Sequence, residues 1–462
     1  MFKRLPMGTE GAGFQRGLLS MAEQYPGHSF WVNVNKNSKH AWRRAGLGGL
    51  LLALGLLWYS PAHAAEPAGR WWKGNIHTHT LWSDGDDYPE MVTDWYKKHG
   101  YNFLALSDHN VVMSGVKWTT VTTNASSPEA FNKYMRRFGP NWVTWKYVDG
   151  RVQTRLKTLA QFRGLFEEPG KFLLIPSEEI TDAFKSKALH LNATNLRYLI
   201  KPQHGKTVIE TLQNNVDAVI EQRERTGQPM FPHINHPNFT WALTAEEIMQ
   251  VKGEKYFEVY NGHPQSHNEG DKTHSAIDRM YDIILTKRLA ELNYGVMYAL
   301  AVDDSHHYHQ WEIPKSNPGR GWIMVRSARL SPDAIVTAME AGDFYSTTGV
   351  RLRDVVRGSV QYRISIEAEP GVTYKTRFIG TRVGYDPSST PIKSEKGEEL
   401  DVTRKYSDTI GQVLAEVEGP EPAYTYKGDE IYVRAIITSS KLKELPYIKN
   451  ELETAWTQPR VK

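Results

Sequence analysis

Histidine and carboxylate side chains are the residues of this chain best suited to chemistry, and the histidines are unevenly distributed. Fourteen of the 17 histidines lie between His77 and His309, and residues 310–462 contain none. Imidazole and carboxylate groups bind divalent transition metals and transfer protons. The chain has no cysteine, which excludes a thiol nucleophile and a thiolate metal site. The pattern therefore predicts a metal-dependent reaction centred on residues 77–309.

These residues recur at the ends of six apolar, strand-like runs, which alternate with helix-like segments at 89–99, at 207–226 and from Ser331 onward. In a β/α barrel, the loops at the carboxyl ends of the strands converge on one face, where the active site lies. Six such endings therefore predict one shared site. The runs and the residues at their ends are 75–79 with His77, His79 and Asp84, 103–106 with Asp108 and His109, 172–175 with Glu178 and Glu179, 230–234 with His236, 256–259 with His263, and 296–302 with Asp303, Asp304 and His306.

A single His-x-His or Ser-Asp-Gly motif is common, but the whole series of motifs over residues 72–350 resembles the PHP family (polymerase and histidinol phosphatase domain) in content and order. The insert at 111–170 and the tail sequence at 455–459 look like those of the exported, carbaryl-hydrolase-like (CehA/McbA) metallohydrolase branch. The motifs are His77-Thr78-His79 with Ser83-Asp84-Gly85, Leu106-Ser107-Asp108-His109-Asn110, Glu178-Glu179-Ile180-Thr181 with His190, Asn235-His236-Pro237, and Asp304-Ser305-His306.

The resemblance implies an α/β fold, a distorted (β/α)7 barrel, with two or three divalent transition-metal ions (Zn, Mn or Fe). It also implies hydrolysis by a metal-activated water, most commonly of phosphate esters in this family. The implied ligands are His77, His79 and Asp304 for one ion, Glu179 as a bridge to a second ion that also takes His190 and His236, and Asp84, His109 and His306 for a third.

Two of the implied carboxylate ligands have an acidic neighbour. Glu179 is preferred because Ile-Thr follows it as in the family, and Glu178 stays the alternative. Asp304 is preferred to Asp303 for its Asp-x-His spacing. These choices are predictions that a structure can test.

Two further residues are candidates for catalysis. His263 follows a strand end and could position substrate or act as a general acid, and Arg320 lies between two glycines, where it could hold an anionic oxygen. Cations near the metals would favour a phosphate ester, whereas an apolar pocket would favour an aryl carboxylic or carbamate ester. The other cations considered are Lys185, Lys187 and Arg197, and the aromatic candidates are Trp118, Trp142 and Trp145.

Residues 1–64 have the composition of a leader with a secretory signal. Basic residues within 39–44 precede an uncharged run at 45–58, and Ala62-His63-Ala64 follows. This order is typical of a cleavable signal, and the run is shorter than the roughly 20 residues that a membrane span needs. The leader predicts a periplasmic or secreted mature chain that begins near Ala65 and has no membrane span, with an N-terminal anchor as the alternative.

The rest of the chain divides into two predicted domains. Residues 65–355 contain all the motifs and form the predicted metallohydrolase barrel, which includes the insert at 111–170. Residues 356–462 contain short alternating runs such as 361–368 and 430–438, which predict a C-terminal antiparallel β-rich domain. Because this domain lacks histidine, we expect no ligands from it.

The charge balance gives no sign of a nucleic-acid partner. The formal net charge of +4 comes from residues 1–64, and the remaining chain is nearly neutral. A small-molecule ester is therefore the predicted partner. A carboxylic or carbamate ester hydrolase on the same metal site is one alternative, and a non-catalytic exported protein that binds metal or polymer is another.

Overall fold

The computed structural model of the chain describes residues 69–122 and 127–462. The predicted leader and its signal lie outside these residues. The described residues all belong to one compact unit. Within the described part of this unit, no helix is long and apolar enough to cross a membrane.

A mixed sheet of 14 strands organises the described residues, in the order β10-β9-β8-β7-β6-β2-β1-β11-β12-β21-β20-β15-β18, with β22 beside β20. The pairs β1/β2, β2/β6, β8/β9 and β9/β10 are parallel, so the carboxyl ends of β1, β2, β8, β9 and β10 are brought toward one edge. The strands are β1 (Arg70–Asn75), β2 (Phe103–Leu106), β6 (Leu173–Phe184), β7 (Lys187–Thr194), β8 (Phe231–Ile234), β9 (Tyr256–Asn261), β10 (Tyr298–Val302), β11 (Trp322–Ser327), β12 (Phe344–Thr347), β15 (Tyr374–Arg382), β18 (Gln412–Glu418), β20 (Glu430–Leu442), β21 (Leu452–Thr457) and β22 (Arg460–Val461).

The (β/α)7 barrel expected from the resemblance is not confirmed, because the described strands form no closed ring and β10 ends the sheet. The backbone of β10 is satisfied there by side chains. Ala301 N–H donates to Ser346 Oγ (3.0 Å), and Ala299 N–H donates to Gln458 Oε1 (3.0 Å). These bonds replace a backbone ladder between β10 and β12, so the edge groups are not left unpaired.

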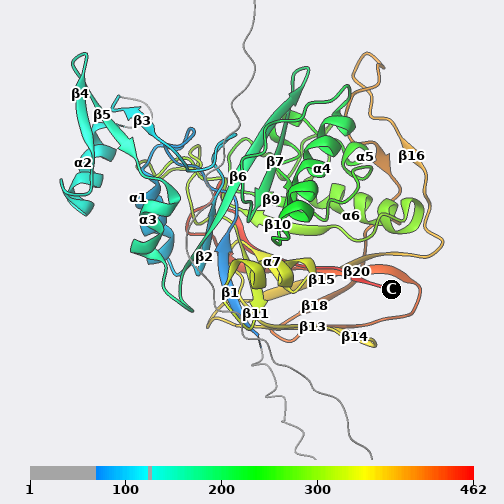
Figure 1. The fold of residues 1–462 in the computed structure, drawn as a ribbon. Coiled ribbons are helices and arrows are strands. Elements are labelled where there is room, and N and C mark those ends of the chain that lie inside the picture. The colour runs from blue at the N-terminus through cyan, green and yellow to red at the C-terminus, as the bar shows by residue number, and fades with distance from the viewer. Residues whose placement is uncertain (1–68, 123–126) are drawn as a thin grey trace, which may run out of the picture. The chain divides into compact units, whose positions relative to one another are not determined.

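The predicted helices are confirmed, with boundaries shifted by a residue or so. Helix α4 (Val208–Thr226) begins after Thr207, whose side chain accepts from Glu210 N–H, and ends at Gly227 in the left-handed region (φ 66°). Helices α4 to α6 lie together along β6 to β10 (Figure 1). The other helices are α1 (Pro89–Lys98), α5 (Ala245–Ile248, with a Thr244/Glu247 capping box), α6 (Ile277–Lys287), α7 (Pro332–Glu340), the 3-10 turn η1 (Phe239–Trp241) and the π turn η2 (Arg288–Leu292).

The insert forms a small layer of its own beside α1 (Figure 1). Tyr134 of the insert stacks on Tyr88 with ring centroids 4.1 Å apart, and Trp142 Nε1 donates to the Glu90 carboxylate (2.8 Å). Trp142 is therefore used to attach the insert to α1. The insert contains β3 (Lys117–Thr120), α2 (Pro128–Phe138), β4 (Trp145–Val148), β5 (Arg151–Leu156) and α3 (Leu159–Phe166).

The C-terminal residues form antiparallel strands, as their alternating pattern predicts, and several of these strands continue the central sheet. Arg434 of β20 is buried and donates from Nε (2.7 Å) and Nη2 (2.8 Å) to the two carboxylate oxygens of Asp282 in α6. The division at residue 355/356 stays a prediction. The remaining strands are β13 (Leu352–Arg357), β14 (Gln361–Ile366) and β19 (Ala423–Thr425) in a three-stranded sheet, and the short pair β16 (Ser389–Thr390) and β17 (Lys405–Tyr406).

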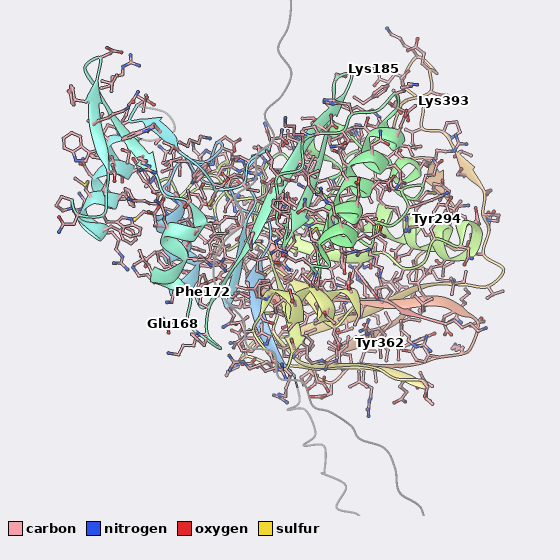
Figure 2. The ribbon with its side chains drawn as sticks, viewed as in Figure 1. Glu168, Phe172, Lys185, Tyr294, Tyr362 and Lys393 are labelled. Atoms are coloured by element: carbon pink, nitrogen blue, oxygen red, sulfur yellow. The ribbon has the colours of Figure 1, made fainter. Side chains whose placement is uncertain are left out.

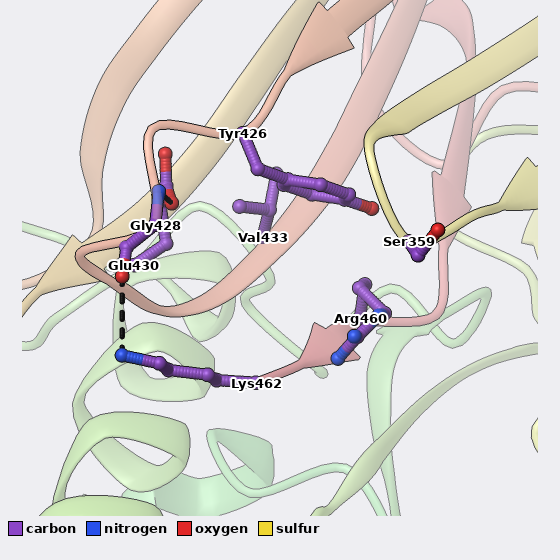
Figure 3. Close-up of a pocket in the computed structure, with 7 residues that line it drawn as sticks. All are labelled: Ser359, Tyr426, Gly428, Glu430, Val433, Arg460 and Lys462. Atoms are coloured by element: carbon purple, nitrogen blue, oxygen red, sulfur yellow. Dashed lines mark hydrogen bonds between the residues drawn. The ribbon is translucent and has the colours of Figure 1, made fainter.

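A small cavity of about 110 Å³ lies among the C-terminal strands, bounded by Tyr426 and Arg460 (Figure 3). Lys462 closes one side by donating from Nζ to the carbonyl of Gly428 (3.1 Å). None of the residues that line this cavity is a predicted ligand.

Candidate metal centre

The structure brings all nine predicted ligand residues together. Their donor atoms form overlapping groups, and within each group the atoms lie no more than 4.8 Å apart. Each group in this cluster contains three or four imidazole and carboxylate donors that could hold a divalent cation. The groups are His77/His79/Asp304, His79/Asp84/His109/His306, His77/Glu179/His236 and His109/Glu179/His190.

Glu179 lies at the centre of the cluster and is fully buried. Burial alone raises the pKa of this carboxyl, but the surrounding imidazoles hold the pKa well below its usual range. A central carboxylate with imidazoles on both oxygens fits a bridging position. Its Oε2 lies 3.3 Å from His77 Nε2, 3.1 Å from His79 Nε2 and 3.1 Å from His109 Nδ1, and its Oε1 lies 3.0 Å from His190 Nδ1 and 3.5 Å from His236 Nε2.

Asp304 is a second buried carboxylate of the cluster. Its Oδ1 lies 3.2 Å from both His77 Nε2 and His79 Nε2. The Asp304 backbone adopts a left-handed conformation (φ 48°), which is strained for a residue with a Cβ. Strain of this kind is retained where the surroundings require a particular side-chain direction, as at a ligand.

Asp84 lies on the open side of the cluster, with its side chain 55% exposed. It lies 3.4 Å from His306 Nε2 and 3.5 Å from His109 Nε2. This is the group that the resemblance assigns to a third ion. His79 also belongs to it, with Nδ1 at 3.6 Å from Asp84.

The chemistry of the donor set fits divalent transition metals. His79 Nε2 and His190 Nδ1 are buried and lie 3.1 Å and 3.0 Å from Glu179 oxygens, yet neither makes a hydrogen bond. Buried polar atoms without a partner are costly, and a shared cation would satisfy both the imidazoles and the carboxylate. Mixed imidazole and carboxylate donors suit Zn, Mn or Fe better than Mg or Ca.

The structure distinguishes the two acids within each neighbouring pair, Glu178/Glu179 and Asp303/Asp304. Glu178 turns away from the cluster and accepts the Ile200 N–H (2.6 Å), and burial raises its pKa to about 8. Asp303 accepts three backbone N–H groups from residues 319–321 and the hydroxyl of Tyr96 (2.7 Å). Glu178 and Asp303 therefore stabilise the fold, and Glu179 and Asp304 are the acids that lie in the cluster.

Glu258 is the functional carboxylate that the sequence reasoning missed. It is buried in β9 and lies 2.6 Å from His77 Nδ1 and 3.1 Å from His233 Nε2. Burial raises the pKa of Glu258, but His77 and His233 lower it to about 2, so this carboxylate is ionised and can only accept. His77 therefore donates from Nδ1, and its Nε2 faces the cluster, 3.3 Å from Glu179 Oε2 and 3.2 Å from Asp304 Oδ1. A lone acid within an apolar strand run was the signal in the sequence.

Arg320 does not have the predicted role. Its side chain is almost completely buried (1% exposed) and donates to the carbonyls of Gly262 (2.8 Å), Glu312 (3.2 Å) and Ile313 (3.3 Å). A guanidinium used in this way stabilises the loops behind the cluster. Arg320 is also absent from the described lining of the cavity over the cluster, so the structure does not support the anion-holding role expected from its two glycine neighbours.

A cavity of about 280 Å³ opens over the cluster, and His263 lines it. Burial, with smaller effects from neighbouring charges, lowers the pKa of His263 to about 3, so its imidazole is neutral near pH 7 in the metal-free chain. Its proposed positioning or acid role stays a prediction. The lining residues are Asp84, His109, Glu179, His190, His236, Phe239, His263, Gln265, Asp304, His306 and His307.

Several residues considered for substrate contact do not line this cavity. Lys187 is paired with Glu247 (3.2 Å) and Asp401 (2.9 Å), and Lys185 lies at the outer tip of the β6/β7 hairpin (Figure 2). Arg197, Trp118, Trp142 and Trp145 are likewise absent from the described lining. Phe239 is the one carbocyclic aromatic ring among the described lining residues.

Comparison with known proteins gives distant structural neighbours. No protein-family model matches the chain, and no curated protein matches it. The chain is similar to a two-domain protein from Bacteroides vulgatus that contains a predicted PHP-like metal-dependent phosphoesterase, with 14% identity over 86% of this chain and 96% of that chain and a TM-score of 0.38.

Two further neighbours cover about half of the chain. A proposed metal-dependent phosphoesterase from Bifidobacterium adolescentis has 12% identity over 50% of this chain and 87% of that chain, with a TM-score of 0.26. An amidohydrolase from Chromobacterium violaceum with bound sulfate has 14% identity over 53% of this chain and 93% of that chain, with a TM-score of 0.24. Scores this low establish neither the family nor the activity of this chain.

Proposed function

We propose that this chain is an exported, metal-dependent phosphoesterase of the PHP type. The observation that carries the proposal is the buried Glu179 carboxylate, which has imidazole nitrogens of five histidines within 3.5 Å of its two oxygens. The order of the sequence motifs supports the family, and the composition of the leader supports export to the periplasm or the medium.

In such a site, the described side chains would have separate roles. Bound divalent ions would lower the pKa of a water molecule and stabilise negative charge on the ester. Glu179 and Asp304 supply anionic donors on two sides of the cluster, and Glu258 orients His77 through its Nδ1. His263 and Phe239 form part of the wall above the donors, where they limit access of water and orient the substrate.

The polarity of the cavity favours a phosphate ester over an aryl carboxylic or carbamate ester. The described lining is made of imidazoles, carboxylates and one amide, with Phe239 as the single carbocyclic ring. An aryl ester would need an apolar pocket, and the tryptophans of the insert do not provide one at this cavity. The carbamate-type activity is therefore the second candidate on the same metal site.

A substrate panel tests the proposal. The metal-loaded mature protein should turn over chromogenic phosphate esters faster than aryl acetates and carbamates, and Glu179→Gln should abolish turnover together with most of the bound metal. Faster turnover of a carbamate would transfer the assignment to the second candidate. Metal binding without turnover of any ester would favour the non-catalytic interpretation.

A further inference from the structure

A second cleft adjoins the metal cluster and is larger than the cavity above it. Its volume is about 680 Å³, and the two hollows share Asp84, His306 and His307. A substrate held at the cluster would therefore extend into this cleft. The cleft is lined by Asp84, Asp86, Ser127, Pro128, Glu129, His306, His307, His309, Gln310 and Lys315.

Lys315 is the cation of this cleft that is free to bind a substrate. Its side chain is half-buried, and within residues 69–122 and 127–462 its ammonium has no ion pair or hydrogen bond. The neighbouring Lys133 is already engaged, because its Nζ lies 2.9 Å from Glu129 and 3.0 Å from His309 Nδ1. A half-buried ammonium without a partner is unusual and favours an anion that arrives from solution.

The backbone around Lys315 is attached to the proposed ligands. The next residue, Ser316, accepts the N–H groups of His306 (2.9 Å) and His307 (2.9 Å) through its carbonyl, and its hydroxyl donates to the Asp304 carbonyl. Lys315 is therefore held at a fixed place beside the ligand segment. Because this backbone is already ordered, only the Lys315 side chain itself must become ordered when an anion binds.

None of the three carboxylates of the cleft forms an ion pair with Lys315. Asp84 lies 3.4 Å from His306 Nε2 and 3.5 Å from His109 Nε2. Glu129 is paired with Lys133, and Asp86 accepts the Tyr308 N–H (2.8 Å). Neither lies within ion-pair distance of the Lys315 ammonium among the described residues. The charge of Lys315 is thus available at the mouth of the metal site.

We propose that Lys315 binds an anionic oxygen of the substrate and determines a preference for phosphate monoesters, an inference that rests on the proposed phosphoesterase function. A monoester carries close to two negative charges near pH 7, a diester carries one and a carboxylic ester carries none. The contribution of Lys315 therefore decreases in that order. It takes the anion-binding role that the sequence had suggested for Arg320.

Kinetics on three matched p-nitrophenyl substrates test the inference. Lys315→Met should lower kcat/KM for the phosphate monoester by about 10- to 100-fold, lower it less for the bis(p-nitrophenyl) diester, and leave the acetate unchanged. Lys315→Arg, which keeps the charge, should retain most of the monoester activity. Lys187→Met removes a paired lysine and is the matched control, for which we expect wild-type kinetics.

Binding of inorganic phosphate provides a second measurement that does not depend on turnover. Isothermal titration of the metal-loaded proteins should show phosphate binding at least tenfold weaker to Lys315→Met than to the parent, with equal metal content and equal melting temperature. Equal losses on all three substrates, or equal phosphate affinity in parent and variant, would overturn the inference. If the parent hydrolyses no phosphate ester, the proposed function fails, and the phosphate titration still decides whether Lys315 binds the anion.

Discussion

Glu258→Gln is the change that most directly probes how the fold prepares the metal site. The Glu258 carboxylate accepts from His77 Nδ1 at 2.6 Å, from the backbone N–H of His236 at 2.8 Å and from the Asn261 amide at 2.8 Å. Glutamine has almost the same shape but carries no charge and offers one acceptor oxygen in place of two. The change thus weakens the orientation of His77 without opening a cavity.

The expected magnitude follows from the position of Glu258 behind a ligand. Loss of a carboxylate that orients a metal-binding histidine typically lowers metal affinity by about 10- to 100-fold, which corresponds to about 1.4–2.8 kcal/mol. The lower end applies if the amide oxygen of the introduced glutamine keeps the His77 contact, and the upper end applies if its amino group faces Nδ1. A competition titration with a chromophoric chelator, using Zn or Mn, measures the change in affinity.

Glu178→Gln is the matched control. Glu178 is also a buried glutamate, but its contact is the Ile200 N–H (2.6 Å), and its raised pKa of about 8 keeps it protonated near pH 7. Glutamine imitates that neutral acid, so metal affinity should not change. Equal metal affinities for the parent and Glu258→Gln would refute the orienting role, as would an equal loss in both variants.

Four further outcomes are expected. Asp304→Ala should remove at least one metal ion per chain, measured by elemental analysis, while circular dichroism shows that the fold is retained. Arg434→Met should destabilise the chain by about 3–5 kcal/mol in urea unfolding, because it leaves the buried Asp282 carboxylate without its cation, and replacing Asp282 by Leu in the same chain should recover much of this loss. Glu178→Gln should gain melting temperature relative to the parent as the pH rises from about 4.5 to about 8, because the folded chain keeps a proton that the unfolded chain releases; a constant difference at all pH values would contradict the raised pKa. Chelation with EDTA should lower the melting temperature, since the cluster then holds its carboxylates without cations, and no shift in a calorimetric scan would argue against bound metal.

The site was easier to predict from the sequence than the sheet that carries it. Each predicted ligand follows or lies in a strand, and local features such as the Thr207 cap and Gly227 fixed the helix boundaries. The barrel closure was not predictable in this way. It depends on whether β10 meets a backbone partner, and in the structure Ser346 and Gln458 take that place from segments 45 and 159 residues away.

Glu258 and Arg320 show the limit of reasoning from residue type. A ligand is identified by its motif, but Glu258 lies in an apolar strand without a motif, and its role depends on which strand lies beside it. Arg320 had a suggestive local sequence, yet its guanidinium is used by carbonyls at 262, 312 and 313. Such contacts between distant segments are fixed by tertiary packing, so spacing along the chain does not predict them.

The C-terminal strands support the metal centre although they contain no histidine. Gln458 donates to the Ala299 carbonyl (2.9 Å) and accepts its N–H (3.0 Å), so the tail contacts β10 directly. β10 ends at Val302, and the segment 303–306 that follows carries Asp304 and His306. The position of these two donors therefore depends on a strand that pairs with β9 on one side and bonds on its outer side to the side chains of Ser346 and Gln458. A segment without predicted ligands can thus influence the geometry of the candidate metal centre, because it contacts the strand that leads to two of the predicted ligands.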